Sequence, residues 1–444
     1  MPFFQESNKK PGENSALSSG LNYKLGRRKF VFYALSAGLA VVAHSFSTQS
    51  SAQSAKEGNS APVMNDQDGV NLLPQDESLR VINIFLCGDV MTGRGIDQVL
   101  PYPGNPILYE GYMKSAVGYV QLAEAKNGPI PKPVDFSYIW GDALDELERR
   151  KPDLRIINLE TAVTRSNDVQ DKAVNYRMNP DNIPCILAAK IDCCALANNH
   201  ILDWGYAGLA ETLDTLKKVG IKTPGAGRNL GEARAPALMP VSRKGRILVF
   251  SFGSETSGIP WSWGAKPDKP GVNLLPDFSL TTVKEIRRQI GQEKRTGDVV
   301  VASIHWGGNW GYQVPHEQQE FAHWLIDDGG VDIVHGHSSH HVKGIEVYRG
   351  KLILYGCGDF LNDYEGISGH ESYRGDLGLM YFAAVEPANG KLVRLTMVPM
   401  QMKRFRLNYA SKKDVAWLKD VLDREGHKFG TAVEVVSNTM LLRW

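Results

Sequence analysis

Residues 81–89 read VINIFLCGD, and this stretch sets the pattern that decides the fold. The run from Val81 to Leu86 is short, aliphatic and rich in β-branched side chains, which is typical of a strand buried on both faces. Gly88 and Asp89 follow where the apolar run stops. In open α/β sheets, ligands bind at the rim formed by the carboxyl ends of the strands. The stretch therefore predicts a central strand that carries Asp89 to a binding cleft.

Four later stretches repeat this layout of an apolar run followed by a polar motif. The runs cover residues 154–157, 191–197, 299–304 and 331–334, and the motifs after them are Asn158-Leu159-Glu160, Asn198-Asn199-His200, His305-Trp306-Gly307 and His337-Ser338-Ser339-His340. Because the motifs fall at strand ends, side chains that are distant in sequence are expected to meet in one cleft. Helical patterns alternate with the strands, at residues 143–150, 209–219, 283–289 and 318–327. This alternation predicts a layered α/β domain.

The second half of the chain predicts hairpins and loops around these units. Strand patterns at 345–347, 352–355, 379–385 and 393–399 are linked by turns such as Arg349-Gly350 and Asn389-Gly390. Hairpins after βαβ units favour two sheets packed face to face, with helices outside. Residues 102–135 and 253–276 are rich in Gly and Pro and are predicted to be long loops that either bind substrate or pack on the domain. The second loop carries Trp261 and Trp263.

The composition narrows the class of protein. With 444 residues, 42% hydrophobic and 22% charged, the chain is an ordinary globular protein. A formal net charge of +1 gives no basic field that would favour nucleic acid as a partner. The five cysteines are few and odd in number, so they are expected to be small buried side chains and not a disulfide framework.

The N-terminal segment is typical of an export signal. Lys24, Arg27 and Arg28 precede an apolar run at residues 30–43 that is short for a membrane span, and Ser50-Ser51-Ala52 offers small residues for cleavage. The Arg27-Arg28 pair resembles a twin-arginine signal, and an uncleaved membrane anchor is the alternative. We expect an exported, periplasmic or cell-envelope protein. Its parts are predicted as a signal at 1–52, a flexible linker at 53–78, a domain at 79–405 and a C-terminal helix and strand at 406–444.

The histidines point to a metal site. Of the eleven in the chain, four fall within seven residues: His335, His337, His340 and His341. Together with His305, Asp89, Glu160 and Asn199 they offer nitrogen and oxygen ligands, which suit Mn, Fe or Zn better than calcium. One or two divalent ions are expected. Two ions about 3.5–4 Å apart would clamp a phosphoryl group, as in two-metal hydrolases.

The ordered motifs resemble the CapA-like poly-gamma-glutamate capsule biosynthesis family, which is related to the calcineurin-like metallophosphoesterases. The resemblance covers residues 81–402 and is carried by Gly88-Asp89, Asn158-Leu159-Glu160, Leu196 to His200 with Asp203, Gly225-Ala226-Gly227, His305-Trp306-Gly307, Gly336 to His340 and Tyr355 to Phe360. It implies a four-layer αββα sandwich with mixed sheets and a metal site at one rim.

The resemblance also implies a role for each site residue. The metal ligands would be Asp89, Glu160, Asn199, His305, His337 and His340. His200 would serve as general acid, and Arg94 would stabilise phosphoryl charge or, alternatively, only pack a loop. Asn158, Asp203 and Asp359 would support the ligands. Three residues depart from the family patterns. Met91 stands where the metallophosphoesterases have a histidine ligand, so the site is expected to hold either one ion or two. Asn309 stands where the capsule family usually has an acid, and Asp359 stands where it usually has an asparagine.

Three functions follow from these motifs. The first is metal-dependent hydrolysis of a phosphoester. The second is a non-catalytic accessory role in binding or exporting poly-gamma-glutamate or another anionic polymer, with capsule-synthesis membrane proteins as partners. The third is hydrolysis or transfer at amide bonds of such a polymer. Nucleic acid is not an expected partner, and membrane contact is expected only through an uncleaved signal.

Overall fold

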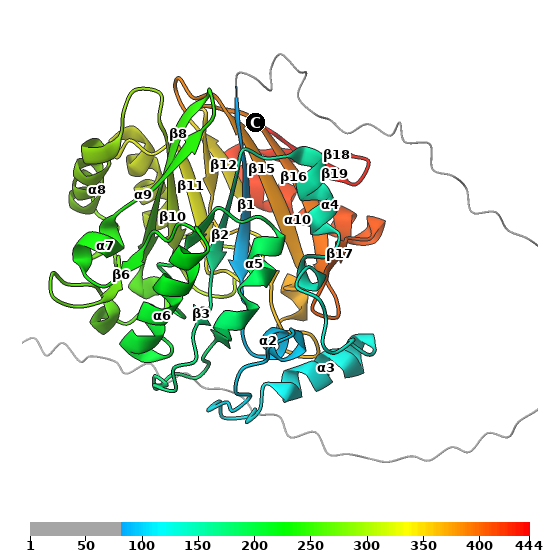
Figure 1. Cartoon of the computed structure of the whole chain (residues 1–444). Helices are drawn as coiled ribbons and strands as arrows, with labels where there is room; N and C mark the ends of the chain where they lie inside the picture. The colour runs from blue at the N-terminus through cyan, green and yellow to red at the C-terminus, as the bar shows by residue number, and fades with distance from the viewer. Residues whose placement is uncertain (1–80) are drawn as a thin grey trace, which may run out of the picture. The chain divides into compact units, whose positions relative to one another are not determined.

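The computed structural model describes residues 81–444, so the predicted export signal and linker lie outside the described residues. Two mixed sheets form the centre of this part of the chain (Figure 1). The first has nine strands in the order β18 (Ala432–Val436), β19 (Thr439–Arg443), β16 (Leu392–Met402), β15 (Leu377–Val385), β1 (Ile82–Val90), β2 (Leu154–Leu159) and β5 (Cys193–Ala195), with β14 (Asp359–Leu361) beside β1 and β17 (Leu407–Tyr409) beside β16.

The second sheet has six strands. Their order is β12 (Ile345–Tyr348), β13 (Lys351–Leu354), β11 (Ile333–His337), β10 (Val299–His305), β8 (Gly245–Gly253) and β7 (Ala237–Val241). Two short strand pairs complete the set: β3 (Ala162–Val163) with β4 (Arg177–Met178), and β6 (Ala226–Gly227) with β9 (Gly271–Val272).

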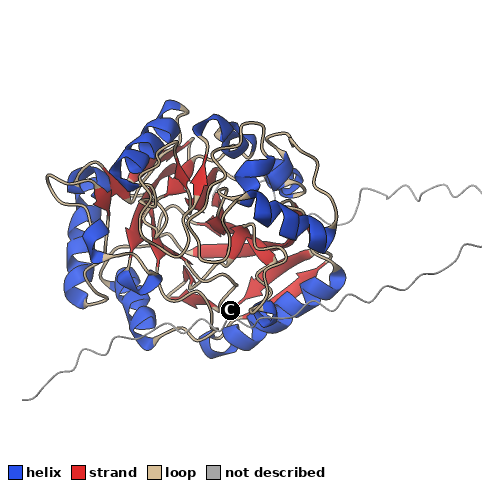
Figure 2. Cartoon of the chain, turned by 90° about the horizontal axis from the view of Figure 1, so that it is seen from below, coloured by secondary structure: helices blue, strands red, loops and turns tan. Residues whose placement is uncertain are grey.

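Helices cover the outside of the strands (Figure 2). They are α2 (Gly95–Val99), α3 (Val117–Asn127), α4 (Ala143–Arg150), α5 (Pro184–Ala188), α6 (Gly205–Lys218), α7 (Leu230–Arg234), α8 (Leu280–Glu293), α9 (His316–Asp327) and α10 (Lys412–Gly426). No helix within residues 81–444 is long and apolar enough to span a bilayer.

Alternating side chains of the strands build three hydrophobic clusters. Ile84 of β1 packs with Val301 of β10 in the cluster between the two sheets. Its neighbour Phe85 points the other way, into a cluster that α4 and α6 cover. The outer face of the second sheet buries side chains of α8 and α9 in the same manner. The order helix, sheet, sheet, helix confirms the predicted four-layer αββα sandwich with mixed sheets.

Strand register brings the motifs together. Asp89 at the end of β1 is paired with Asn158 of the parallel strand β2. In the other sheet, His305 at the end of β10 is paired with His337 at the end of β11. Each pair lies at the carboxyl end of parallel strands, so the rim predicted to hold the ligands is formed by both sheets.

The prediction of one long loop at 102–135 was wrong for residues 117–127, which form α3. This helix buries Tyr119, Val120 and Ala123, and Tyr119 lies against the Arg94 guanidinium. The apolar patch was too short to show a helical period in the sequence, so tertiary packing decides its structure. The other polar stretch, 253–276, buries Trp263 and exposes Trp261.

The C-terminal segment extends the first sheet. Strand β19 pairs with β16, β18 pairs with β19, and α10 contributes Leu418 to the core between the sheets. All five cysteines are buried and unbonded within residues 81–444, as small hydrophobic side chains would be.

Candidate metal centre

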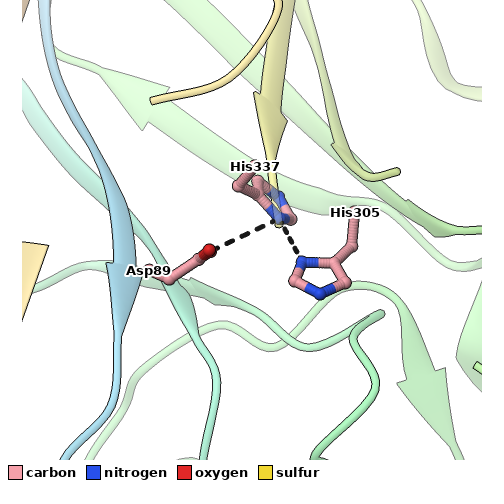
Figure 3. Close-up of side chains that lie close together, drawn as sticks. All are labelled: Asp89, His305 and His337. Carbon is pink, nitrogen blue, oxygen red and sulfur yellow. Dashed lines mark hydrogen bonds and ion pairs between the residues drawn. The ribbon is translucent and has the colours of Figure 1, made fainter. Parts of the chain in front are cut away.

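The first ligand group lies where the two sheets face each other. Figure 3 shows Asp89 from β1 approaching His305 and His337 from the neighbouring strands β10 and β11. His337 Nδ1 is 2.8 Å from His305 Nδ1 and 3.8 Å from Asp89 Oδ1. Each of the three residues offers one ligand atom, and these atoms all lie within 4.8 Å of one another. This separation is small enough for all three to bind a single ion.

A second ligand group shares Asp89 with the first. It adds His340 and Asp359, whose Nδ1 and Oδ1 atoms are 2.8 Å apart. Asp359 was expected only to support other ligands, but here its carboxylate is a potential ligand itself. Asp89 belongs to both groups, so it would contribute to either ion if two were bound.

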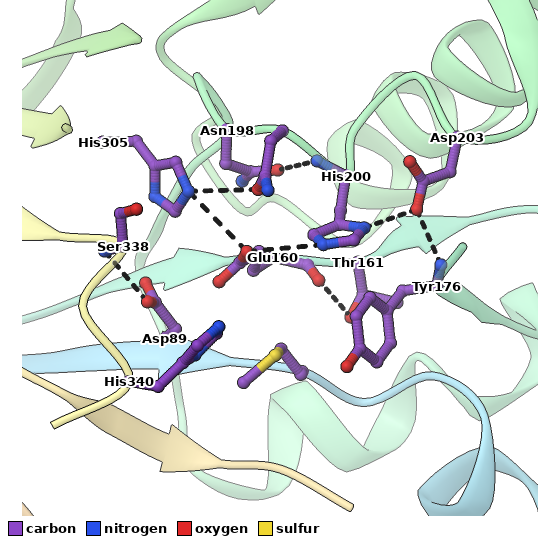
Figure 4. Close-up of polar contacts among 12 residues, drawn as sticks. Asp89, Glu160, Thr161, Tyr176, Asn198, His200, Asp203, His305, Ser338 and His340 are labelled. Atoms are coloured by element: carbon purple, nitrogen blue, oxygen red, sulfur yellow. Dashed lines mark hydrogen bonds and ion pairs between the residues drawn. The ribbon is translucent and has the colours of Figure 1, made fainter. Parts of the chain in front are cut away.

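Glu160 lies between the metal groups and His200. Its Oε1 is 3.7 Å from both His305 Nε2 and His200 Nε2 (Figure 4). Its Oε2 is buried and has no hydrogen-bond partner among the described residues. A buried carboxylate oxygen without a donor is costly, and a cation would remove this cost. The donor set therefore fits a divalent metal, which the structure does not itself contain.

The charges at the centre favour the same conclusion. Burial raises the pKa of Asp89 to about 7, and the neighbouring Asp359 adds to this shift. Burial also raises the pKa of Glu160 well above its ordinary value, with further contributions from Asp89 and Asp359. Three carboxylates in so small a volume repel one another unless positive charge is present.

Two of the histidines, His305 and His337, are in the neutral state that metal binding requires. Burial lowers the pKa of His305 and of His337 well below the ordinary value, so both rings are neutral at neutral pH. For His340, burial alone would lower the pKa, but the carboxylates of Asp359 and Asp89 outweigh it and raise the pKa.

Hydrogen-bond donors hold Asp89 from both sides. Asn198 Nδ2 donates to Asn158 Oδ1 at 3.1 Å, and Asn158 Nδ2 donates to Asp89 Oδ1 at 2.7 Å. The Ser338 N–H donates to Asp89 Oδ2 at 3.0 Å. Ser338 has a φ of 100°, a conformation that non-glycine residues rarely adopt and that is concentrated at functional sites. These contacts agree with the supporting role predicted for Asn158.

His200 is held by the acid predicted to support it. Its Nδ1 donates to Asp203 Oδ2 at 2.6 Å, and burial lowers its pKa to about 4 although Asp203 opposes this effect. Lys172 completes the group, with Nζ 2.5 Å from Asp203 Oδ1 and bonded to the Asn199 carbonyl. Sequence reasoning missed Lys172, because it stands in a polar stretch without any motif.

Arg94 is not free to bind a substrate phosphate. Its Nε and Nη2 donate to the two oxygens of Asp363 at 3.1 and 2.5 Å, and its Nη1 donates to Glu110 at 3.0 Å. The guanidinium also lies between the rings of Tyr119 and Tyr176, 3.9 and 4.5 Å from their centroids. The loop-packing alternative therefore describes its contacts better than the predicted contact with phosphoryl charge.

The position of the missing ligand is filled by protein. Met91 is buried, and its sulfur accepts a hydrogen bond from the Tyr364 hydroxyl at 3.6 Å. On the second sheet, His305 Nε2 lies 3.1 Å from Asn199 Oδ1, which brings this predicted ligand to the edge of the first group. The structure thus gathers every predicted ligand, together with His200 and its support, at one rim.

A cleft leads from the second ligand group to solvent. It encloses about 510 Å³ and is lined by His340, Tyr364, Trp310, Lys126 and Lys403, among others. The two lysines have no ion-pair partner among the described residues, whereas Arg374 on the same wall is paired with Asp376. Acidic side chains, Glu365 and Glu371, line the cleft as well, so both signs of charge face the space that reaches His340.

Comparisons with known proteins agree with this arrangement. The family model for "Bacterial capsule synthesis protein PGA_cap" matches residues 83–364. A Mycobacterium tuberculosis relative named "Probable polyglutamine synthesis accessory protein" is 49% identical over 363 residues, which cover 81% of this chain and 95% of the relative. The "PGA biosynthesis protein CapA" of Bacillus subtilis is 26% identical and covers 64% of each chain. The "Capsule biosynthesis protein CapA" of Bacillus anthracis is 23% identical, over 64% of this chain and 60% of its own length. The chain therefore belongs to the bacterial capsule synthesis protein family, the CapA-like proteins.

Proposed function

We propose that this protein is a metal-dependent hydrolase of a phosphoester that serves capsule or polyglutamate synthesis. The observation that carries the proposal is the buried, unpartnered Glu160 Oε2 beside two ligand groups that share Asp89. A site that only stabilised the fold would not crowd three buried carboxylates beside a histidine, His340, that lines an open cleft.

The residues present fit one or two ions of Mn, Fe or Zn. Asp89, His305 and His337 would hold one ion, with Asn199 and Glu160 beside them, and Asp89, His340 and Asp359 would hold another. When bound, such ions polarise a phosphoester and lower the pKa of water at the site.

His200 is placed to supply a proton to the reaction. Its Nδ1–H is held by Asp203, so the unprotonated Nε2 faces the Glu160 side of the centre. In hydrolysis, the water oxygen bonds to phosphorus and the bond from phosphorus to the leaving oxygen breaks. The water gives up one proton to solvent, and His200 Nε2, after taking up a proton from solvent, gives it to the leaving oxygen as the general acid, so the protons balance. Lys172 and Asp203 keep the imidazole in this orientation.

A second candidate is an accessory protein that binds an anionic polymer without turnover. The name of the mycobacterial relative favours it, and so do Lys126 and Lys403 in the cleft, which have no ion-pair partner within residues 81–444. Metal ions would then bridge carboxylates of the polymer. Hydrolysis or transfer at amide bonds of the polymer is a further proposal for the same centre.

We also propose that the protein acts outside the cytoplasm, in the periplasm or cell envelope. The support is the predicted signal at residues 1–52 together with the capsule-related names of its relatives. Capsule-synthesis membrane proteins are the proposed partners in that compartment.

The test is metal content and turnover of the purified protein, measured on bis(p-nitrophenyl) phosphate with and without EDTA. We expect bound metal and chelator-sensitive release of nitrophenolate. His337→Ala should lose metal. His200→Ala should keep metal and lose about 10²–10⁴-fold in turnover, the range for a general acid–base group. His316→Ala, at an exposed histidine of α9, is the matched control and should change neither.

The outcomes separate the candidates. A wild-type protein without bound metal would contradict the proposal. Bound metal with binding of poly-gamma-glutamate but no phosphoester turnover would favour the accessory role. Release of glutamate from the polymer would favour amide hydrolysis instead.

A further inference from the structure

Two buried side chains behind the metal centre, Ser303 and His335, have no part in the chemistry described so far. Ser303 Oγ lies 2.8 Å from His337 Nε2 and 3.1 Å from His335 Nδ1. His335 Nε2 lies 2.7 Å from the Cys87 carbonyl oxygen of β1. The four groups form a continuous chain of hydrogen bonds from the backbone of the first sheet to a predicted ligand on the second.

The direction of this chain follows from counting protons. The Cys87 carbonyl can only accept, so His335 must carry its proton on Nε2, and its Nδ1 must accept. The Ser303 hydroxyl has one proton, and giving it to His335 Nδ1 satisfies that nitrogen. Ser303 Oγ then accepts from His337. His337 must therefore carry its proton on Nε2, which leaves Nδ1 with a free lone pair.

That lone pair points at the first ligand group. His337 Nδ1 faces His305 Nδ1 at 2.8 Å and Asp89 Oδ1 at 3.8 Å. His305 Nε2 lies 3.1 Å from Asn199 Oδ1, an acceptor, so His305 too carries its proton on Nε2. Both Nδ1 atoms then lack a proton although they face each other. With the Asn199 amide in this orientation, a cation between the two Nδ1 atoms gives every group a partner.

We infer that Ser303 and His335 are positioning residues that hold His337 as its Nε2–H tautomer and so direct Nδ1 to the metal. This inference rests on the proposed metal centre. We call the hydrogen-bond chain from the Cys87 carbonyl through His335 and Ser303 to His337 the relay. Without the relay, the proton of His337 would be free to occupy Nδ1 and would have to be displaced before metal binds. Partners of this kind behind a metal-binding histidine typically change metal affinity by about 10–100-fold.

The relay has a matched control on the next strand. Ser251 of β8 is the register partner of Ser303 of β10, and it is equally buried. The Ser251 hydroxyl accepts from the Ala197 N–H at 3.3 Å and, within residues 81–444, has no hydrogen bond to a histidine of the metal centre. Ser303→Ala and Ser251→Ala therefore remove the same atom from neighbouring strands, and only the first should alter the metal centre.

The first readout is the tautomer itself. In protein labelled with ¹⁵N-histidine, long-range proton–nitrogen NMR spectra distinguish a ring protonated at Nε2 from one protonated at Nδ1. In EDTA-treated protein we expect His337 to be the Nε2–H tautomer, with a shift toward Nδ1–H in Ser303→Ala and no shift in Ser251→Ala. Without metal, we expect the His305 proton on Nδ1, from which it is donated to His337 Nδ1, and we expect the Asn199 amide to be turned so that its NH₂ group donates to His305 Nε2.

The second readout is Zn²⁺ affinity by competition with a chromogenic chelator. Ser303→Ala should bind about 10–100-fold more weakly than wild type. His335→Leu leaves Ser303 free to donate to His337, so it should weaken binding as well. His335→Gln retains an acceptor for the Ser303 hydroxyl and a donor for the Cys87 carbonyl, so it should keep most of the wild-type Zn²⁺ affinity. Thermal unfolding of each variant in EDTA verifies that it is folded.

The two hypotheses fail in different ways. An unchanged His337 tautomer and unchanged Zn²⁺ affinity in Ser303→Ala would overturn the relay while leaving the metal centre intact. If the wild-type protein bound no metal, the proposed metal-dependent function would be wrong. The relay would still stand if the tautomer of His337 shifted in Ser303→Ala and not in Ser251→Ala.

Discussion

Replacing Asp89 by asparagine should stabilise the metal-free protein and abolish its stabilisation by metal. Burial and Asp359 raise the pKa of Asp89 to about 7, against an ordinary value of 3.8. The difference is about 3 pKa units. At 1.36 kcal/mol per unit, ionised Asp89 costs the metal-free fold up to about 4 kcal/mol above pH 7.

The asparagine brings a cost of its own. Both oxygens of Asp89 accept hydrogen bonds, from Asn158 Nδ2 and from the Ser338 N–H. Asn158 cannot turn round without losing the bond that its Oδ1 accepts from Asn198. The new amide nitrogen must therefore face a donor, which costs about 1–3 kcal/mol. The net expectation is a gain of about 1–3 kcal/mol, because relief of the buried charge is the larger effect.

The sign of the pH dependence follows from the raised pKa. Between about pH 4 and pH 7 the folded protein holds a proton that the unfolded chain has released, so metal-free wild type loses stability as pH rises through this window. Asp89→Asn has no such proton. The advantage of the variant should therefore be small at pH 4 and full at pH 8.

Guanidinium denaturation in EDTA at pH 5 and pH 8 measures this difference, with Asp268→Asn at an exposed acid as the control. Adding Mn²⁺ or Zn²⁺ should stabilise wild type by mass action and should barely affect Asp89→Asn. The reasoning is refuted if the variant is less stable than wild type in EDTA at pH 8, or if metal stabilises both proteins equally.

Two further substitutions test buried charges beyond the metal ligands. Lys343 is buried, and the one hydrogen bond that its Nζ makes within residues 81–444 is to the Gln313 carbonyl at 3.4 Å. Burial lowers the pKa of Lys343 to about 8. Because the unfolded chain keeps this proton up to about pH 10.5, wild type should gain stability as pH rises from about 8 to 10.5. Lys343→Met should be more stable by up to about 3 kcal/mol at pH 7, with the gain shrinking at pH 10; equal denaturation midpoints at pH 7 would contradict this. Arg94→Lys should cost about 3–5 kcal/mol in thermal unfolding, because a lysine cannot reproduce the paired bonds to Asp363. The variant also removes the arginine partner of Glu110, which then keeps the hydrogen bond from the Tyr119 hydroxyl. A loss below about 1 kcal/mol would show that these bonds contribute little.

The sequence identified the candidate ligands because polar motifs end apolar runs. Asp89, His305 and His337 each follow a run of buried side chains, and parallel strands place such positions on one rim. The pairing of Asp89 with Asn158 also follows from this logic. What the runs do not contain is the order of the strands, since β15 and β14 reach β1 from almost three hundred residues away.

Other parts of the site left no signal of this kind. Ser303 lies inside a strand, where a single polar residue cannot be distinguished from a satisfied core residue. His335 belongs to the histidine cluster, but the sequence did not show that it contacts Ser303 and the Cys87 carbonyl. Lys172 is placed by its contact with Asp203, and the partners of Arg94 come from loops whose conformation depends on tertiary contacts. Such residues are defined by contacts between distant segments, and a local pattern in one sequence does not encode those contacts.

Because the candidate ligands are divided between the two sheets, a bound ion would link one sheet to the other. Asp89 belongs to the nine-stranded sheet, whereas His305 and His337 belong to the six-stranded one. The binding position exists only after the sheets have docked, so an ion cannot assist the early steps of folding. Before the two sheets can separate, a bound ion must dissociate or lose the ligands that one of the sheets supplies. Bound metal should therefore slow unfolding much more than it speeds folding.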